Sequence, residues 1–397
     1  MSELMETPET TLGSQQLRHQ ADLVIQGFRR LLEDVESRPT SSPRDRSIIH
    51  PLCSKKELLT ELGSSLLPLL KQQVASLTQA LEDPDMLRQD PGPTLELILE
   101  IQPKLAQNWD QIICTMNHIM PLEGPQPDPA IDQNLNEFKP YRLRDLATCI
   151  RGDLQMQIED FLHSARLVIE EIELARDERE TSIGYDSYEL DNSIDSALEW
   201  SKVSELDLLN GCWEGALLQT NAGLEDLLFI VHLNYRPISR PIAQLAKSFI
   251  PLLKLTKLFF NKLLRLGLTI KADVQSYTEM STAQLLLFER SAQAIARSIS
   301  ASVGRLIEPE VEDRAQISQE LIHQISQELI HQLKSLSPLF QSVLLLLNLY
   351  IIPLVPNNKL SSAQIPFKAW LVTWYTLFFK ATNNAINAAN SFAPNLN

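Results

Sequence analysis

Glycine is scarce in this chain: it accounts for 12 of 397 residues, about 3% against a usual ~7%. Doubly wound sheets, phosphate-binding loops and β-sandwiches need glycine at tight turns and where the backbone approaches a ligand, so this composition disfavours them. No convincing stretch alternates polar and apolar residues as a half-buried strand would. The sequence therefore predicts an all-α protein.

Recognised catalytic and cofactor-binding motifs are also missing. The chain has no Gly-x-Gly-x-x-Gly, no Walker A loop, no His-Glu-x-x-His, no Gly-x-Ser-x-Gly and no Cys-x-x-Cys. Its four cysteines lack metal-ligand or redox spacing and are expected to be free, mostly buried thiols: Cys53, Cys114, Cys149 and Cys212. We predict a protein that is not an enzyme and uses no metal or cofactor.

One pattern resembles a metal motif. Residues 316–323 are repeated at once in residues 324–331, which gives Glu320-x-x-His323 and Glu328-x-x-His331. Di-iron bundles place such motifs on two different helices, whereas both copies here fall on one helix, about 12 Å apart. The repeat therefore predicts a solvated helix face.

An excess of positive charge is absent too, since 35 Lys and Arg stand against 50 Asp and Glu, a net charge of -15. Nucleic-acid binding needs a basic surface to neutralise phosphates, so no nucleic-acid partner is expected. The first residues lack the apolar stretch of a signal peptide, and no Asn-x-Ser/Thr site occurs. We expect an intracellular protein of the cytoplasm or nucleus.

Two uncharged apolar runs near the C-terminus raise the question of a membrane span. Residues 339–355 form a run of 17, shorter than the ~20 apolar residues of a membrane span and interrupted by Gln341, Asn348 and Pro353. The run 369–379 is shorter still. A membrane span is therefore not expected, and both helices are predicted to be buried on nearly all sides.

What the chain does contain is a series of long amphipathic helices. Apolar residues recur at steps of three and four along most of it, and Ser54 with Glu57 forms a capping box at one helix start. One continuous helical run is expected near 192–234. We predict long antiparallel helices in one or two packed bundles: a disordered 1–14, an N-terminal bundle 15–120, a Pro-rich linker 121–140 and a larger C-terminal bundle 141–392.

Charge is divided unevenly along these helices. Residues 159–214 contain 16 acidic and four basic residues, whereas 227–272 contain eight basic residues and no acid. After Glu328 there is again no acid, and four lysines. Neighbouring helices of opposite charge can simply pair with each other, or one face can remain available to attract a partner of opposite charge.

The candidate partner-binding residues follow from this pattern. A basic polar stripe and an acidic segment are the two surfaces singled out, with residues Lys247, Lys254, Lys257, Lys262 and Arg265 in the first and Asp186, Glu189 and Asp191 in the second. A basic amphipathic helix is typical of binding to an acidic protein, to calmodulin or to an anionic membrane, but many such helices only pack on a core.

Two stretches, Asn117-His-Ile-Met-Pro121 and the helix from Phe249 to Lys262, resemble uncharacterised helical proteins of rust fungi. The acidic region 159–214, followed by the helix from Phe249 to Lys262, also resembles the cyclin-D1-binding (Grap2 and cyclin-D-interacting) family. The resemblance implies an all-α bundle that binds cell-cycle and helix-loop-helix partners without catalysis. The predicted function is a non-catalytic adaptor or regulator that binds a protein partner. The alternative is a peripheral membrane protein that binds anionic surfaces through helix 241–271.

Overall fold

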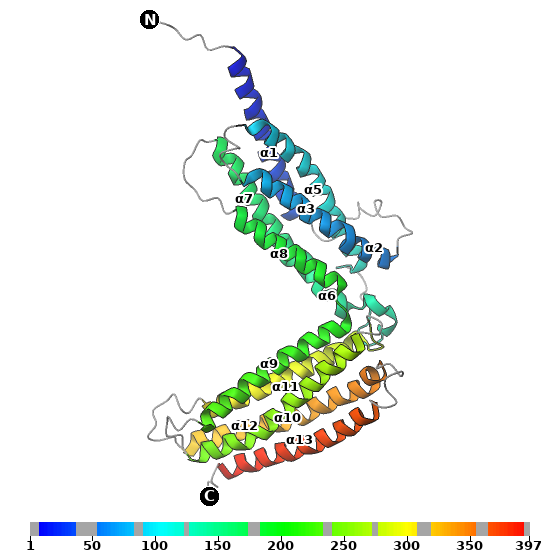
Figure 1. Ribbon diagram of the computed structural model, residues 1–397, viewed down its shortest axis with the longest axis vertical. Coiled ribbons are helices and arrows are strands. Elements are labelled where there is room, and N and C mark those ends of the chain that lie inside the picture. Colours follow the sequence, from blue (N-terminus) through cyan, green and yellow to red (C-terminus); the bar gives the residue numbers. More distant parts are fainter. Residues whose placement is uncertain are drawn as a thin grey trace. The chain divides into compact units, whose positions relative to one another are not determined.

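The computed structural model describes residues 8–36, 54–82, 90–122, 127–173, 183–232, 240–271, 277–307, 319–354 and 364–392. Within these ranges every regular element is a helix and none is a strand, which confirms the all-α prediction (Figure 1). The chain divides into two compact units. Unit 1 comprises Met1–Pro127 and Arg142–Val203, and unit 2 comprises Asp128–Tyr141 and Ser204–Asn397.

Unit 1 is a ring of long helices. Its elements are α1 (Pro8–Glu36), α2 (Lys55–Glu61), the π-helical turn η2 (Leu62–Leu66), α3 (Leu67–Leu81), α5 (Pro91–Ile119), α6 (Pro140–Thr148, in this unit from Arg142 on), the π-helical turn η4 (Cys149–Leu154), α7 (Gln155–Glu173) and α8 (Ile183–Lys202). The main neighbours follow the order α1, α5, α3, α8, α7 and back to α1.

The core of unit 1 is mainly aliphatic, and it includes the fully buried Leu62, Leu70, Leu77, Ile98 and Ile112. The capping box at the start of α2 is confirmed. The Ser54 N–H donates to the Glu57 carboxylate at 2.7 Å, and the Glu57 N–H donates to the Ser54 hydroxyl at 3.3 Å. Two otherwise orphaned N–H groups are satisfied at this helix start.

Unit 2 is a second ring of helices. Its elements are the 3-10 helix η3 (Gln133–Phe138), α9 (Glu205–His232), α10 (Arg240–Lys271), α11 (Thr282–Ile307), α12 (Gln319–Leu346), the π-helical turn η6 (Leu347–Ile351), the 3-10 turn η7 (Ile352–Leu354) and α13 (Gln364–Phe392). Here the main neighbours follow the order α9, α10, α13, α12, α11 and back to α9.

Aromatic rings fill the centre of unit 2, where α10, α12 and α13 meet. The Phe340 ring centroid lies 4.4 Å from that of Phe378, 5.0 Å from that of Trp374 and 5.2 Å from that of Phe259. These separations fall at the close end of the range for aromatic pairs, which add to the hydrophobic burial of the rings. The indole N–H of Trp374 is also satisfied, because it donates to the Leu255 carbonyl at 2.8 Å.

The boundary between the units differs from the expected one. The expected seam was 121–140, with everything from residue 141 in the C-terminal bundle, but Arg142–Val203 belongs to unit 1. The run near 192–234 is not one helix either: α8 ends at Lys202 and α9 starts at Glu205. Ser204 and Asp207 form a second capping box there, with reciprocal hydrogen bonds of 3.0 and 3.1 Å, and this box ends the continuous helix.

Three further expectations need correction. Helix α1 begins at Pro8, so the expected disordered segment 1–14 is partly helical, and residues 1–7 lie outside the described part. Proline suits the first turn of a helix because a backbone N–H at that position would have no acceptor within the helix. Residues 128–140 of the expected linker belong to unit 2, where the side chains of Asp132 and Lys139 are buried. The two uncharged C-terminal helices are not buried on nearly all sides, since Leu345 and Val372 are 60% and 69% exposed.

Candidate functional site: the basic face of helix α10

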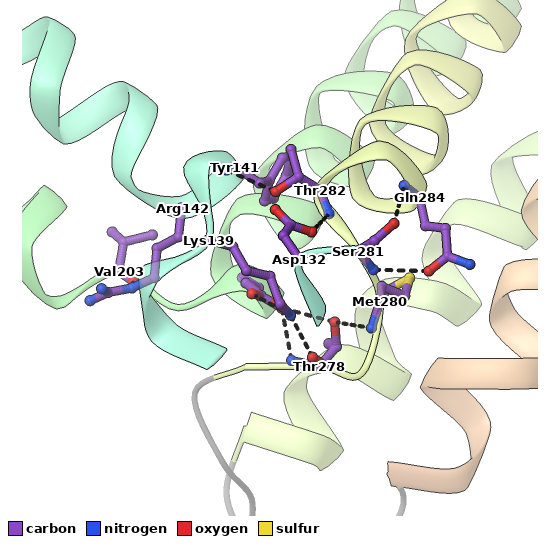
Figure 2. A network of polar contacts seen from close by, with 11 residues as sticks. Asp132, Lys139, Tyr141, Arg142, Val203, Thr278, Met280, Ser281, Thr282 and Gln284 are labelled. Atoms are coloured by element: carbon purple, nitrogen blue, oxygen red, sulfur yellow. Dashed lines mark hydrogen bonds and ion pairs between the residues drawn. The ribbon is translucent and has the colours of Figure 1, made fainter. Parts of the chain in front are cut away.

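The most enclosed polar cluster in the described part of unit 2 joins Lys139, Glu205 and Thr278 (Figure 2). The Lys139 Nζ atom lies 2.9 Å from Glu205 Oε1 and 3.2 Å from Oε2, and it also donates to the Thr278 carbonyl. The Thr278 N–H and hydroxyl both donate to Glu205 Oε2, at 2.7 and 2.8 Å. Both charged side chains are 0% exposed.

The same segment caps the start of α11. Asp132 accepts a hydrogen bond of 2.7 Å from the Thr282 N–H (Figure 2). The Ala283 N–H donates to the Pro129 carbonyl at 2.8 Å. A carboxylate at a helix N-terminus satisfies an orphaned N–H and complements the helix dipole. Residues 128–141 are thereby fixed against the beginnings of α9 and α11.

Electrostatics assign this network a structural role. Burial raises the pKa of the Glu205 carboxyl above its ordinary value, while the charge of Lys139 and the hydrogen bonds from Thr278 oppose that shift. Because neither charged side chain has exposed surface, a molecule in solution reaches neither of them. Ion pairs of this kind are costly to break rather than chemically reactive.

The basic stripe lies on α10, on the side of the helix away from the core. Lys247, Lys254 and Arg265 are exposed, and Lys257 is half-buried. Between them the core residues Phe249, Leu253 and Phe260 are fully buried, as the helical spacing predicts. The structure therefore brings the predicted basic residues onto one helix and leaves several of them in solvent.

Two members of the predicted stripe have other contacts. The Lys262 Nζ lies 5.8 Å from the ring centroids of both Phe367 and Trp370 on α13, which is within cation–π range. Arg265 also interacts with another residue, so it is not a free cation. Lys262 thus supports the packing of α10 against α13.

Three lysines remain without an ionic partner. Within the described ranges, no carboxylate forms an ion pair with Lys247, Lys254 or Lys257. We call these three residues the basic face of α10. Helix α10 has seven basic residues and no acidic one, so its own sequence supplies no counter-charge either.

The acidic candidates lie on α8 in unit 1 and are largely engaged there. Asp191 forms an ion pair of 3.1 Å with Lys71, and Asp195 pairs with the same lysine at 2.6 Å. The hydrogen bond to Asp195 is the main reason that the pKa of Lys71 is raised. Asp186 accepts a hydrogen bond from Ser164, and Glu189 is half-buried. Asp186 and Asp191 therefore join helices within unit 1.

The duplicated Glu-x-x-His pattern lies on α12. Glu328 pairs with Arg305 of α11 at 2.8 Å, and His323 and His331 are exposed. Within the described ranges, no group of three or more His, Cys, Asp or Glu side chains is placed to hold a metal ion.

Sequence reasoning missed two features. The Lys139–Glu205 pair joins residues 66 positions apart, and no local pattern links them. The exposed apolar side chains Leu345, Leu349, Val372 and Phe379 were also missed, although their spacing of four and seven residues within α12–η6 and α13 is that of one helix face.

Two regions of the chain are similar to known protein-family models. Residues 55–202 match the model of a domain of unknown function (DUF8723), and residues 204–387 match that of a second domain of unknown function (DUF8721). No curated protein and no solved structure matches the chain. The two matched regions meet at Val203, which is also where unit 1 ends and the long second part of unit 2 begins.

Proposed function

We propose that this protein is a non-catalytic interaction protein that binds an acidic segment of a protein partner on the basic face of α10. The observation that carries the proposal is the solvent exposure of Lys247 and Lys254, together with the absence of an ionic partner for them and for Lys257 among the described residues. Three unpaired cations on one helix attract a segment of opposite charge.

The net charge of the chain restricts an acidic partner to the basic face of α10. At -15 overall, most of the molecule repels an acidic partner, while α10 attracts it. Long-range attraction of this kind acts mainly on the association rate and on the choice of partner, and packing of apolar side chains then sets the lifetime of the complex. Leu258, 55% exposed beside these lysines, supplies such an apolar contact.

An adaptor or regulator inside the cell fits this chemistry. The three described cysteines are free thiols, which suits a reducing compartment. The resemblance to the cyclin-D1-binding family points to the same class of function, binding without catalysis.

The test compares two charge reversals of equal size. Lys247→Glu with Lys254→Glu alters the basic face, and Arg290→Glu with Arg297→Glu alters two exposed arginines at the same spacing of seven residues on α11. A partner that is captured by the wild-type chain and identified by mass spectrometry is purified, and its association rate is measured at several salt concentrations. We expect the α10 double variant to associate about tenfold more slowly at low salt and to lose most of the salt dependence.

The α11 double variant serves as the control for total charge. If both variants slow association equally, net charge rather than the α10 face governs binding, and the proposal is wrong. Equal association rates for the wild type and the α10 variant would also exclude the basic face of α10 as the binding surface. Circular dichroism of both variants verifies that the helices are retained.

A further inference from the structure

The outer side of α12 and α13 exposes large apolar side chains. Leu345 is 60% exposed, Leu349 56%, Val372 69% and Phe379 53%. We call these four residues the α12–α13 outer face. An exposed apolar group of this size in a folded protein is typical of a binding surface.

Helix geometry places the four side chains on one surface. Phe340 and Phe378 point into the core and touch each other, with ring centroids 4.4 Å apart. At about 100° per residue, Leu345 and Leu349 point away from the core on the α12 side, as do Val372 and Phe379 on α13. The Gln341 side chain donates to the Tyr375 hydroxyl at 2.8 Å and links the two helices between these side chains. The surface is therefore outward-facing, with a polar link at its centre.

On the two helices that carry this face, every charged residue after Glu328 is a lysine. The chain has no Asp or Glu after Glu328, and Lys334, Lys368 and Lys380 are exposed on α12 and α13. Lys368 and Lys380 lie twelve residues apart, about 18 Å along the helix, and bracket the apolar side chains of α13. The exposed apolar residues of α9 differ, since Leu218 and Phe229 have the exposed acids Glu214, Glu225 and Asp226 nearby on the same helix.

We propose that the α12–α13 outer face binds the surface of an anionic lipid bilayer. Outward apolar side chains enter the boundary between headgroups and acyl chains, and the lysines bind lipid phosphates at its rim. The lack of acidic side chains after Glu328 on these two helices favours an anionic bilayer, because the negative membrane surface would repel any carboxylate placed there. The site is separate from the protein-binding face proposed on α10 and does not depend on it.

The contact is peripheral rather than transmembrane. The run His323–Leu354 is long and apolar enough to cross a membrane by length and composition alone, although a core helix of a soluble protein meets the same criteria. In this fold Leu333, Phe340 and Leu347 of that run are fully buried against the other helices of unit 2. A bilayer span would remove them from the core, whereas surface binding uses only the side chains that are already exposed.

The experiment is co-sedimentation of the full chain with vesicles of phosphatidylcholine, with and without phosphatidylserine. We expect binding to the phosphatidylserine vesicles and little to the neutral ones. Val372→Asp with Phe379→Asp should lower the partition coefficient about tenfold or more. Each of Lys368→Gln and Lys380→Gln should lower it about fivefold.

Leu218→Asp with Phe229→Asp is the matched control, because it introduces the same charge at equally exposed apolar residues of α9. This variant should bind as the wild type does, and all four positions are exposed, so folding is retained and is checked by circular dichroism. Equal losses in the two Asp pairs would show a general charge effect and overturn the proposal. The proposal would also be overturned if the wild-type chain bound vesicles with and without phosphatidylserine equally. Self-association of the chain through Val372 and Phe379 in the absence of lipid would overturn it as well.

Discussion

Units 1 and 2 are both rings of long helices, yet their helices follow different orders around the ring. In unit 1 the neighbours run α1, α5, α3, α8, α7, and in unit 2 they run α9, α10, α13, α12, α11. Unit 2 thus places its first two long helices, α9 and α10, side by side, whereas in unit 1 α1 and α3 are separated by α5 on one side and by α7 and α8 on the other. Amphipathic helices of similar length satisfy their apolar faces in more than one order, so the order depends on which side chains fit.

The two units also differ in how they use charge and aromatic rings. Unit 1 joins its helices with exposed ion pairs, such as Lys71 with Asp191 and Asp195, and Arg29 with Glu170. In the described part of unit 2, Lys139 and Glu205 form a fully buried pair, and Arg305 and Glu328 form a partly exposed one. Every aromatic ring pair between described residues also lies in unit 2. The buried ion pair of unit 2 should therefore affect stability far more than the exposed ion pairs of unit 1.

The largest expected effect comes from removing one partner of the buried pair. Lys139→Met should destabilise unit 2 by about 3–5 kcal/mol, because Glu205 is left buried without its counter-charge. The corresponding change in unit 1, Lys71→Met, should cost only about 0.2–1 kcal/mol, because that pair is exposed to solvent. Urea unfolding gives the overall loss, and hydrogen exchange assigns it to a unit.

A double variant tests the reason for this difference. Lys139→Met with Glu205→Leu removes both charges, and it should recover much of the stability that Lys139→Met loses. If Lys139→Met and Lys71→Met cost the same, the contrast between buried and exposed pairs does not govern the stability of the two units.

An intermediate effect is expected at one glycine in each unit. A Cβ atom on Gly27 would lie 2.0 Å from Gln102 Oε1, and one on Gly267 would lie 2.1 Å from Asn210 Oδ1. Gln102 is held by a hydrogen bond of 2.9 Å to the Val24 carbonyl, whereas Asn210 Oδ1 has no hydrogen-bond partner within the described residues. Gly27→Ala should therefore cost about 1–3 kcal/mol, and Gly267→Ala less.

Thermal unfolding of the two alanine variants measures how much stability each substitution costs. Adding Gln102→Ala to Gly27→Ala should restore part of the stability, since the clash is with that side chain. A larger loss for Gly267→Ala than for Gly27→Ala would reverse the ranking and show that the anchored amide is not the more rigid neighbour.

The smallest effect concerns alkaline pH in unit 1. Burial raises the pKa of the Cys149 thiol to about 11 from an ordinary value of 9.0, and the charge of Asp153 adds to the shift. The folded state therefore retains a proton that the unfolded chain loses. The stabilisation is fully present below pH 9 and is lost as the pH rises to about 11.

Hydrogen exchange in unit 1 across this pH range checks the effect, with Cys149→Ala as the comparison. The variant should be less stable at neutral pH, because it leaves a small cavity, but its stability should fall less between pH 9 and pH 11. Parallel pH curves for the two proteins would contradict the assignment to Cys149.

Much of the fold follows from local patterns in the sequence. The all-α class and the capping box of Ser54 and Glu57 were predicted because each depends on residues within a few positions of one another. The capping box of Ser204 and Asp207 has the same form, yet it lies inside an uninterrupted apolar repeat, and the repeat was read as one helix. The unit boundary was instead predicted at the Pro-rich stretch 121–140, whereas Arg142–Val203 belongs to unit 1.

The candidate surfaces were predictable only in part. The sequence indicated which residues share the basic stripe of α10, because helical spacing fixes the side on which a residue lies. It did not indicate that Lys262 contacts Phe367 and Trp370, because that contact depends on how α13 packs against α10. The exposure of Val372 and Phe379 likewise depends on the order of helices around the ring.

The segment 128–141 has a consequence for where the chain can be cut. The matched regions 55–202 and 204–387 are divided at Val203. A fragment that keeps only residues 204–397 would contain Glu205 but not Lys139, so a buried carboxylate would lose its cation. Such a fragment should be less stable than unit 2 with residues 128–141 retained.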